Sequence, residues 1–214
     1  MILATNPSTA HPDQAQVLFW DASWEFYEAI LQEYGETPQK INFDNGTIEL
    51  MTLSTEHEWL KTFIGDLVNV IAMERTIPMA RRGSQTLKSK PKAKGLEPDE
   101  CFYIARAKEM RGVKRLDLSR DPPPDLVIEV DVEHHVVDRE AIYAALGVPE
   151  MWRFKNGQLE TFRLEGGMWQ LSEYSLSFPF LRVSDLAPFI ERTSTEDETA
   201  VLIAFRDWLR DQPS

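Results

Sequence analysis

The chain has very little cysteine and no long apolar run. Its 214 residues include a single cysteine, Cys101, so no disulfide can form within the chain, which favours a reducing compartment. No hydrophobic stretch approaches the ~18 residues that cross a membrane. The first 17 residues also lack the basic start and apolar run of an export signal. We therefore expect a soluble, cytoplasmic protein without a membrane partner.

Positive charge is also scarce over the chain as a whole. Lys and Arg number 23 against 35 Asp and Glu, which gives a net charge of −12 and argues against a nucleic-acid binder. Residues 81–115 depart from this average, with eleven basic and four acidic residues, or +7, which leaves −19 for the rest. This asymmetry indicates either a surface that meets a polyanion or a solvated loop that keeps the chain soluble. The residues predicted to bind nucleic acid are Arg81, Arg82, Lys88, Lys90, Lys92 and Lys94.

The length and the 43% hydrophobic content fit one globular domain. We expect a flexible N-terminal segment over residues 1–17 and a single domain over 18–214. Apolar periodicity, caps and turn signals predict helices at about 21–35, 55–75, 138–146 and 195–209. The predicted strands are 41–51 as a hairpin, 78–88, 98–104, 125–132, 150–154, 159–165 and 168–172. This alternation predicts an α/β or α+β fold, with a mixed sheet flanked by helices, additional hairpins and a C-terminal helix.

The strand predicted over 125–132 carries the most chemical information. Side chains on a strand alternate between its faces, so Leu126 and Ile128 share an apolar face while Asp125, Glu129 and Asp131 share the other. Same-face neighbours lie roughly 7 Å apart, and like charges this close need water or a cation between them. The strand is therefore either amphipathic with a solvated acidic face or part of a divalent metal site. Carboxylates that bind a metal ion, next to basic residues that bind phosphate, would suit the hydrolysis of phosphodiesters.

Three separate motifs carry a family resemblance. They are EPDECFYI at 97–104, PPDLVIEV at 123–130 and YAALGVPEMW at 143–152. Together they resemble the putative restriction endonuclease family expanded in cyanobacteria, a branch of the PD-(D/E)XK nuclease superfamily. The resemblance spans about residues 54–164. It implies a restriction-endonuclease-like core of a helix, a mixed sheet of about four strands, a helix and a further strand, and hydrolysis of DNA that depends on Mg²⁺ or Mn²⁺.

The resemblance also assigns roles to individual residues. Asp99 matches the first metal-binding aspartate, and Glu129 matches the acidic residue of the third core strand. Glu58, in the first turn of the helix at 55–75, matches the helical glutamate that often completes the metal site. Asp125 belongs to the motif either as a metal ligand or as a turn residue.

The lysine of this superfamily is missing from its usual place. It normally follows the acidic residue by two positions, where this chain has Asp131. Relatives often carry it on the next helix, four residues before the tyrosine, and counting back from Tyr143 gives Arg139. Arginine stabilises charge on a phosphate but is a poor base, because it stays protonated. The alternatives are a slow site, another cation such as Lys88, or an inactive site.

Several of these residues have simpler structural roles open to them. Glu58 stands at capping-box spacing from Thr55 and would then only begin the helix. Asp99 follows a proline and fits a turn. His134 and His135 are adjacent on an extended segment and point apart, so we expect exposed loop residues. Cys101 is expected to be a small buried hydrophobe.

The first hypothesis is a metal-dependent DNA endonuclease, active as a homodimer. Its catalytic residues would be Asp99, Glu129, Arg139 and Glu58, with Asp125 as a further metal ligand. The second is a catalytically inactive nuclease fold that binds nucleic acid or protein. A third, weaker alternative is a hydrolase of another phosphate ester.

Overall fold

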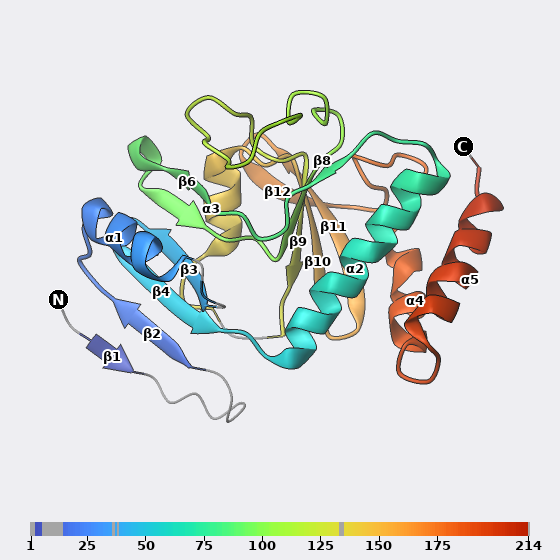
Figure 1. Ribbon diagram of the computed structural model, residues 1–214, viewed down its shortest axis with the longest axis horizontal. Coiled ribbons are helices and arrows are strands. Elements are labelled where there is room, and N and C mark those ends of the chain that lie inside the picture. The colour runs from blue at the N-terminus through green and yellow to red at the C-terminus, as the bar shows by residue number, and fades with distance from the viewer. Residues whose placement is uncertain (1–2, 6–14, 36, 38, 133–134, 214) are drawn as a thin grey trace.

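Two six-stranded sheets and five α-helices make up the described fold. The computed structural model describes residues 3–5, 15–35, 37, 39–132 and 135–213, and Figure 1 shows their arrangement. The helices are α1 (Trp24–Tyr34), α2 (Thr55–Glu74), α3 (Arg139–Leu146), α4 (Ala187–Arg192) and α5 (Glu198–Arg210), with short 3₁₀ turns η1 (Lys90–Lys92) and η2 (Val183–Leu186). Among the described residues, no helix is both long and apolar enough to cross a membrane.

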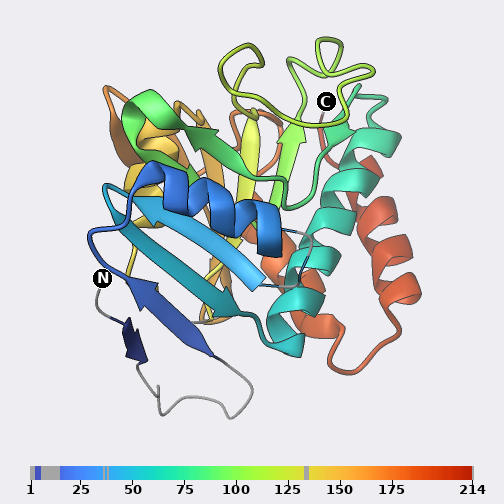
Figure 2. The ribbon, with the colours of Figure 1, turned by 60° about the vertical axis from the view of Figure 1, so that its left-hand side comes forward.

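The first sheet, sheet A, is built mostly from the N-terminal quarter of the chain. Its order is β1-β2-β4-β3-β7-β6, and all its pairs are antiparallel. The strands are β1 (Leu3–Thr5), β2 (Gln16–Phe19), β3 (Gln39–Asp44), β4 (Thr47–Thr52), β6 (Leu87–Ser89) and β7 (Lys94–Leu96). Helix α1 lies across this sheet (Figure 2), with Tyr27 and Ile30 packed on Ile41 and Phe43. The segment predicted to be flexible, 1–17, therefore includes strand residues at 3–5 and 16–17.

The second sheet, sheet B, is mixed. Its order is β12-β11-β10-β9-β8-β5, and only β9 and β10 run parallel, joined through α3. Its strands are β5 (Ala80–Arg81), β8 (Glu100–Tyr103), β9 (Leu126–Val130), β10 (Glu150–Lys155), β11 (Gln158–Glu165) and β12 (Met168–Ser172). The order α2, β5, β8, β9, α3, β10 reproduces the helix, sheet, helix and strand of the core that the family resemblance implies. The predicted mixed α/β fold is confirmed.

Strand β9 is buried on both faces, which excludes a solvated acidic face. Leu126 and Ile128 join the core formed with α2, α5 and β10. Val127, on the other face, packs with Ile142 and Tyr143 of α3. A parallel strand covered on both sides is the usual position for a hydrophobic strand in a mixed fold. Glu129 therefore lies inside the molecule, where its charge needs partners.

Helix starts differ slightly from the predictions. The side chain of Ser23 accepts the N–H of Phe26, and that of Ser54 accepts the N–H of His57, so these serines are the N-caps of α1 and α2. Neither Asp21 nor a Thr55–Glu58 box serves as the cap. The strand predicted over 78–88 is divided between the two sheets as β5 and β6, and α4 was not predicted. Asn45 and Gly46, both with positive φ, form the predicted turn between β3 and β4.

Candidate active site

Asp99 immediately precedes β8, and Glu129 lies in the neighbouring strand β9. Strands β8 and β9 are antiparallel with Glu100 opposite Ile128, so the next step of the register places Asp99 beside Glu129. The backbone N–H of Val130 donates to Asp99 Oδ2 at 2.8 Å. Both residues are buried, at 3% and 7% exposure. The antiparallel pairing of β8 and β9 thus brings together two residues that are 30 positions apart in the sequence.

Arg139 neutralises Glu129. Its Nε and Nη2 donate to the two carboxylate oxygens at 2.8 and 2.7 Å in a bidentate ion pair. Its remaining donors reach Asn42 Oδ1 at 3.0 Å and the carbonyl of Glu97 at 2.9 Å. The hydroxyl of Tyr143 also donates to Glu129. Burial and the charge of Glu129 raise the pKa of Tyr143 well above its usual value, so this hydroxyl stays protonated.

Lys40, on β3 of sheet A, neutralises Asp99. Its Nζ lies 3.0 Å from Asp99 Oδ1 and donates to the carbonyls of Glu97 and Pro98. On the other carboxylate oxygen, Nε2 of His57 lies 3.0 Å from Oδ2. Burial opposes ionisation of Asp99, but Lys40 and His57 outweigh it and hold the pKa of this carboxyl well below its usual range. Asp99 is therefore a buried, ionised carboxylate.

A second carboxylate of sheet A, Glu49, extends the polar network. It is fully buried and accepts from Asn42 Nδ2 at 3.0 Å and from the N–H of Val136 at 2.7 Å. Nδ1 of His135 lies 3.4 Å from the same carboxylate. Burial raises the pKa of Glu49, yet these hydrogen bonds outweigh it and lower that pKa overall. Glu49 thus joins the chain after β9 to sheet A. His135 was expected to be exposed but is largely buried, while His134 lies outside the described residues.

A cavity of about 260 Å³ opens beside Glu129. It is also lined by Arg139, Asp131, Arg153 and Lys155. Lys155 pairs with Asp131 at 2.6 Å, and Arg153 pairs with Glu140 at 2.6 Å. Because the cavity wall carries carboxylates and cations side by side, it suits a ligand that has both an anionic group and a bound cation.

Glu58 and Asp125 lie away from this cluster. Glu58 is 49% exposed and pairs with Lys61 at 2.8 Å, because Ser54 begins the helix and turns His57 toward Asp99 instead. One residue changes the direction of a helical side chain by about 100°. Asp125 accepts the N–H groups of Ile104 and Arg106 at 2.7 and 3.0 Å and so anchors the loop between β8 and β9.

The six cations predicted to bind nucleic acid all have partners within the protein. Their contacts are Arg81 with Asp66 and Glu100, Arg82 with the carbonyl of Met110, Lys88 with Glu28, Lys90 with Glu25, Lys92 with the carbonyl of Ala145, and Lys94 with Asp44. Lys88, proposed as an alternative cation for the site, lies 2.7 Å from Glu28 of α1 and not beside Asp99. Four of these six cations are therefore paired with acids from other parts of the chain, and Arg82 and Lys92 donate to backbone carbonyls.

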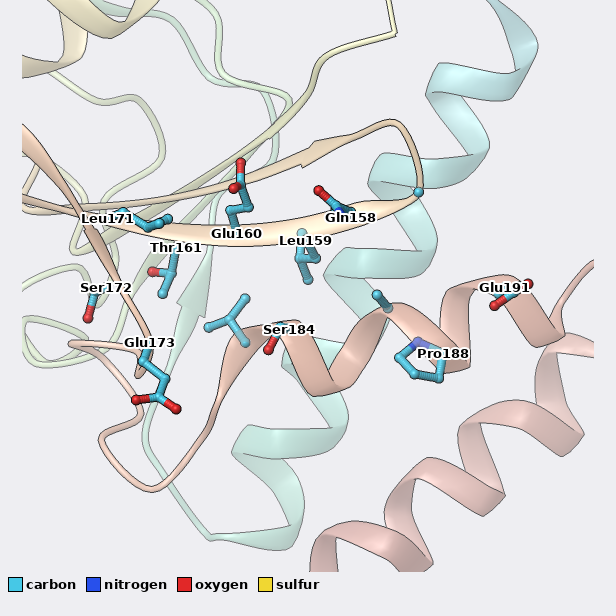
Figure 3. Close-up of a pocket in the computed structure, with 13 residues that line it drawn as sticks. Gln158, Leu159, Glu160, Thr161, Leu171, Ser172, Glu173, Ser184, Pro188 and Glu191 are labelled. Atoms are coloured by element: carbon cyan, nitrogen blue, oxygen red, sulfur yellow. The ribbon is translucent and has the colours of Figure 1, made fainter.

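A larger cavity, of about 660 Å³, lies between β11, β12 and the segment of η2 and α4. Figure 3 shows Leu159 and Thr161 pointing toward the helical segment with Ser184, whereas Glu160 points to the other side of the strand. There Glu160 pairs with Arg153 at 3.2 Å. This cavity contains none of the predicted site residues.

The carboxylates of the candidate site could hold a divalent ion only together with water and substrate oxygens. No group of three or more His, Cys, Asp or Glu side chains gathers as a metal cluster within the described ranges. Magnesium is nevertheless often held by one or two carboxylates, with water and substrate phosphates completing its shell. Asp99 and Glu129 fit that pattern, because both are ionisable oxygen ligands on adjoining strands. An ion there competes with Lys40 and Arg139 for the same oxygens.

Comparisons with known proteins place these observations in a family. Residues 24–195 match the family model described as Uma2, putative restriction endonuclease. The chain is also similar to a crystal structure of a putative nuclease belonging to DUF820 from Anabaena variabilis, with 12% identity and a TM-score of 0.49 over 82% of this chain and 98% of that chain. A comparison with curated proteins finds no match.

Proposed function

Because the chain belongs to the Uma2 family of putative restriction endonucleases, we propose that it is a metal-dependent endonuclease that hydrolyses phosphodiester bonds of DNA. One observation carries this proposal above the others. Asp99, just before β8, and Glu129 of the neighbouring strand β9 are brought together by the register of these strands, and Arg139 reaches Glu129 where a cavity opens beside it. The expected ion is Mg²⁺ or Mn²⁺.

Each polar residue has a distinct part in this proposal. Asp99 and Glu129 would hold the ion, which supplies an acidified water molecule and neutralises charge on the phosphate. Lys40 and Tyr143 keep the two carboxylates oriented through the contacts described above. Arg139 remains protonated and stabilises the negative charge that develops on the phosphate oxygens.

Arg139 and the expected ion would share Glu129 as a partner. The bidentate pair places the guanidinium on Glu129 at the wall of the cavity. If Asp99 and Glu129 held a divalent ion, which would supply charge neutralisation and an acidified water, Arg139 would be positioned beside it to bind a phosphate oxygen of the substrate.

Calorimetry with Mn²⁺ and cleavage of supercoiled plasmid DNA test the proposal on the full chain. We expect Glu129→Gln to lower metal affinity by about 10-fold to 100-fold and to abolish cleavage. Glu58→Gln is the matched control, because it changes the same group at an exposed position, and it should keep both activities. Binding and cleavage that survive Glu129→Gln, or that are lost in Glu58→Gln, would overturn the site.

A specific observation favours a second candidate, a nuclease fold that binds DNA without cutting it. Each carboxylate oxygen of Asp99 and Glu129 already has a donor or cation within hydrogen-bond distance, from Lys40, His57, Val130, Arg139 or Tyr143. If Lys40 and Arg139 permanently fill the place of the ion, the protein retains DNA without Mn²⁺ and never cleaves it. The same two assays distinguish the candidates.

We further propose that the enzyme acts as a homodimer, since cutting both strands of a duplex requires two sites related by a two-fold axis. Strand β12 is an edge of sheet B and carries Met168 and Leu171, each 66% exposed. Exposed apolar edge strands readily pair with a second copy. Light scattering coupled to gel filtration should give a dimer for the wild type and a monomer for Leu171→Glu. A monomeric wild type would contradict this proposal.

A further inference from the structure

The loop between β8 and β9, residues 105–121, presents positive charge that the rest of the protein leaves unpaired. It contains six basic and three acidic residues. Four exposed cations, Lys108, Arg111, Lys114 and Arg115, form no ion pair with any other described residue. Among the cations at 81–94, Arg81, Lys88, Lys90 and Lys94 already form ion pairs, whereas Arg82 and Lys92 donate to backbone carbonyls. Exposed cations without an ion pair are therefore found at 108–115, after the residues 81–94 that were predicted to bind nucleic acid.

The loop is anchored at several points, so these cations occupy defined positions. Asp125 accepts the backbone N–H of Arg106 and that of Ile104, just before the loop, and the guanidinium of Arg106 donates to the carbonyl of Pro123 at 2.9 Å. Met110 is buried at 1% exposure, and its carbonyl accepts from Arg82. Gln85 donates to the carbonyl of Lys114 at 3.2 Å. A preorganised cationic loop loses less entropy on binding than a disordered tail.

Three of the four unpaired cations, Arg111, Lys114 and Arg115, also border a hollow in the surface. A cavity of about 600 Å³ is lined by Arg111, Gly112, Val113, Lys114, Arg115, Arg120 and Asp121. Arg120 is partly neutralised by Asp117 and Asp121, at 3.7 and 3.9 Å. The lining thus has a positive excess in a protein of net charge −12. A polyanion is repelled by most of such a surface and approaches where the local charge is positive.

The loop joins β8 and β9 at the end of these strands that is opposite to Asp99 and Glu129. It projects beyond β8 and β9 in both ribbon views (Figures 1 and 2). Asp125, where the chain enters β9, and Glu129 are four residues apart, which is about 13 Å along a strand. One helical turn of DNA spans about 34 Å. A duplex with one phosphate at Glu129 is long enough to reach the loop.

We propose that residues 105–121 are the surface that holds the phosphate backbone of duplex DNA, with Lys108, Arg111, Lys114 and Arg115 as its contacts. This inference rests on the proposed function, because the loop would bind the same DNA that the candidate site would cleave. It assigns affinity to this loop and not to the block at 81–94. The loop contacts carry no sequence information by themselves, since phosphates are the same at every base pair.

Fluorescence anisotropy of a labelled duplex in EDTA measures this binding without any hydrolysis. The variant Arg111→Glu, Lys114→Glu, Arg115→Glu should bind more than about tenfold more weakly at low salt. Its plot of log affinity against log salt should be flatter by about 0.9 for each phosphate that the variant no longer neutralises. Unchanged affinity and slope in this variant would overturn the inference, as would a wild type that does not bind the duplex at low salt.

A matched control separates local from overall charge. Arg182→Glu, Arg192→Glu, Arg206→Glu makes the same change in net charge on the C-terminal elements, where these residues pair with Glu173, Glu196 and Asp207. It should bind DNA almost as the wild type does, and an equal loss in the control would overturn the assignment to the loop. If the wild type shows loop-dependent binding in EDTA but never cleaves with Mn²⁺, the loop inference stands and the proposed hydrolysis fails.

Discussion

Two buried glutamates on adjoining parallel strands satisfy their charge in opposite ways. Glu129 of β9 is held by the cation Arg139 and by Tyr143, and it borders a cavity. Glu150 of β10 is fully buried, and the donors that reach it from the described part of the chain are all neutral. Those donors are Trp152 Nε1, Thr161 Oγ1, Ser175 Oγ and the N–H groups of Leu176 and Ser177, at 2.7–3.2 Å.

This difference indicates different roles: Glu150 holds parts of the structure together, whereas we propose that Glu129 exchanges its partner for a metal ion. Fixed neutral donors from three segments close around Glu150 and tie the chain after β12 to sheet B, and a ligand has no access to it. Glu129 is balanced by the charged side chain of Arg139 and borders a cavity, as the proposed exchange for a divalent ion requires. Burial and a negative charge alone therefore do not identify a functional carboxylate; the kind of partner does.

The largest expected effect is the loss of stability on substitution of Glu150. Glu150→Ala leaves two backbone N–H groups, an indole N–H and two hydroxyls without their acceptor. Each buried unsatisfied donor costs about 1–3 kcal/mol, so we expect the free energy of unfolding to fall by about 3 kcal/mol or more. Urea unfolding measures this loss. Glu150→Gln keeps one acceptor oxygen and should lose less; equal stability of Glu150→Ala and wild type would show that Glu150 is no anchor.

Breaking the ion pair between Arg139 and Glu129 should lower the free energy of unfolding almost as much. A second substitution should restore most of this loss. Arg139→Met leaves Glu129 buried and unpaired, which we expect to lower stability by about 3 kcal/mol. Adding Glu129→Met removes the orphaned charge and should restore most of it. Thermal and urea unfolding of the two variants form the measurement. A double variant as unstable as Arg139→Met would mean that packing, and not charge balance, dominates at this position.

The pH dependence of Glu49 should be a smaller effect. Its pKa is lower in the folded protein than its ordinary value, so it contributes stability above the ordinary pKa of about 4.3, and this contribution is lost as pH falls through the lowered folded pKa. Glu49→Gln should be less stable than the wild type at neutral pH. The difference should shrink below about pH 4 in unfolding curves recorded across acid pH. A difference independent of pH would contradict the lowered pKa.

The smallest effect is expected at Lys88. Both members of its pair with Glu28 are more than a third exposed, so Lys88→Ala should change the free energy of unfolding by less than about 0.5 kcal/mol. Plasmid cleavage should also be unchanged. A loss of cleavage in this variant, with the fold intact by circular dichroism, would restore Lys88 as the catalytic cation.

The fold was largely predictable because its signals are local. The turn at Asn45 and Gly46, the hairpin between β10 and β11, and the start of α3 at Asp138 all follow from residues within a few positions of each other. The division of 78–88 between two sheets was not predictable, since strand pairing depends on partners far along the chain. The alternation of β9 indicated its two faces but not that both are covered.

The site was predictable only where a motif recorded it. Asp99, Glu129 and Arg139 were identified through the family resemblance, and the structure brings them to one site. Lys40 was missed because it lies 59 positions from Asp99 in a strand without a motif. The nucleic-acid role of the cations at 81–94 stays a prediction. Their ion pairs with Glu25, Glu28 and Asp44 could not be predicted, because these acids lie far from them in the sequence.

The placement of Lys40 makes the two sheets energetically inseparable. An ammonium and a carboxylate that meet inside a protein each lose their water, and neither tolerates being left alone there. Detaching sheet A would remove the Lys40 ammonium from the buried Asp99 and leave His57 as its remaining side-chain partner, so we expect a fragment without the N-terminal strands to be less stable. Exchange of these strands between relatives would require a matching change at Asp99.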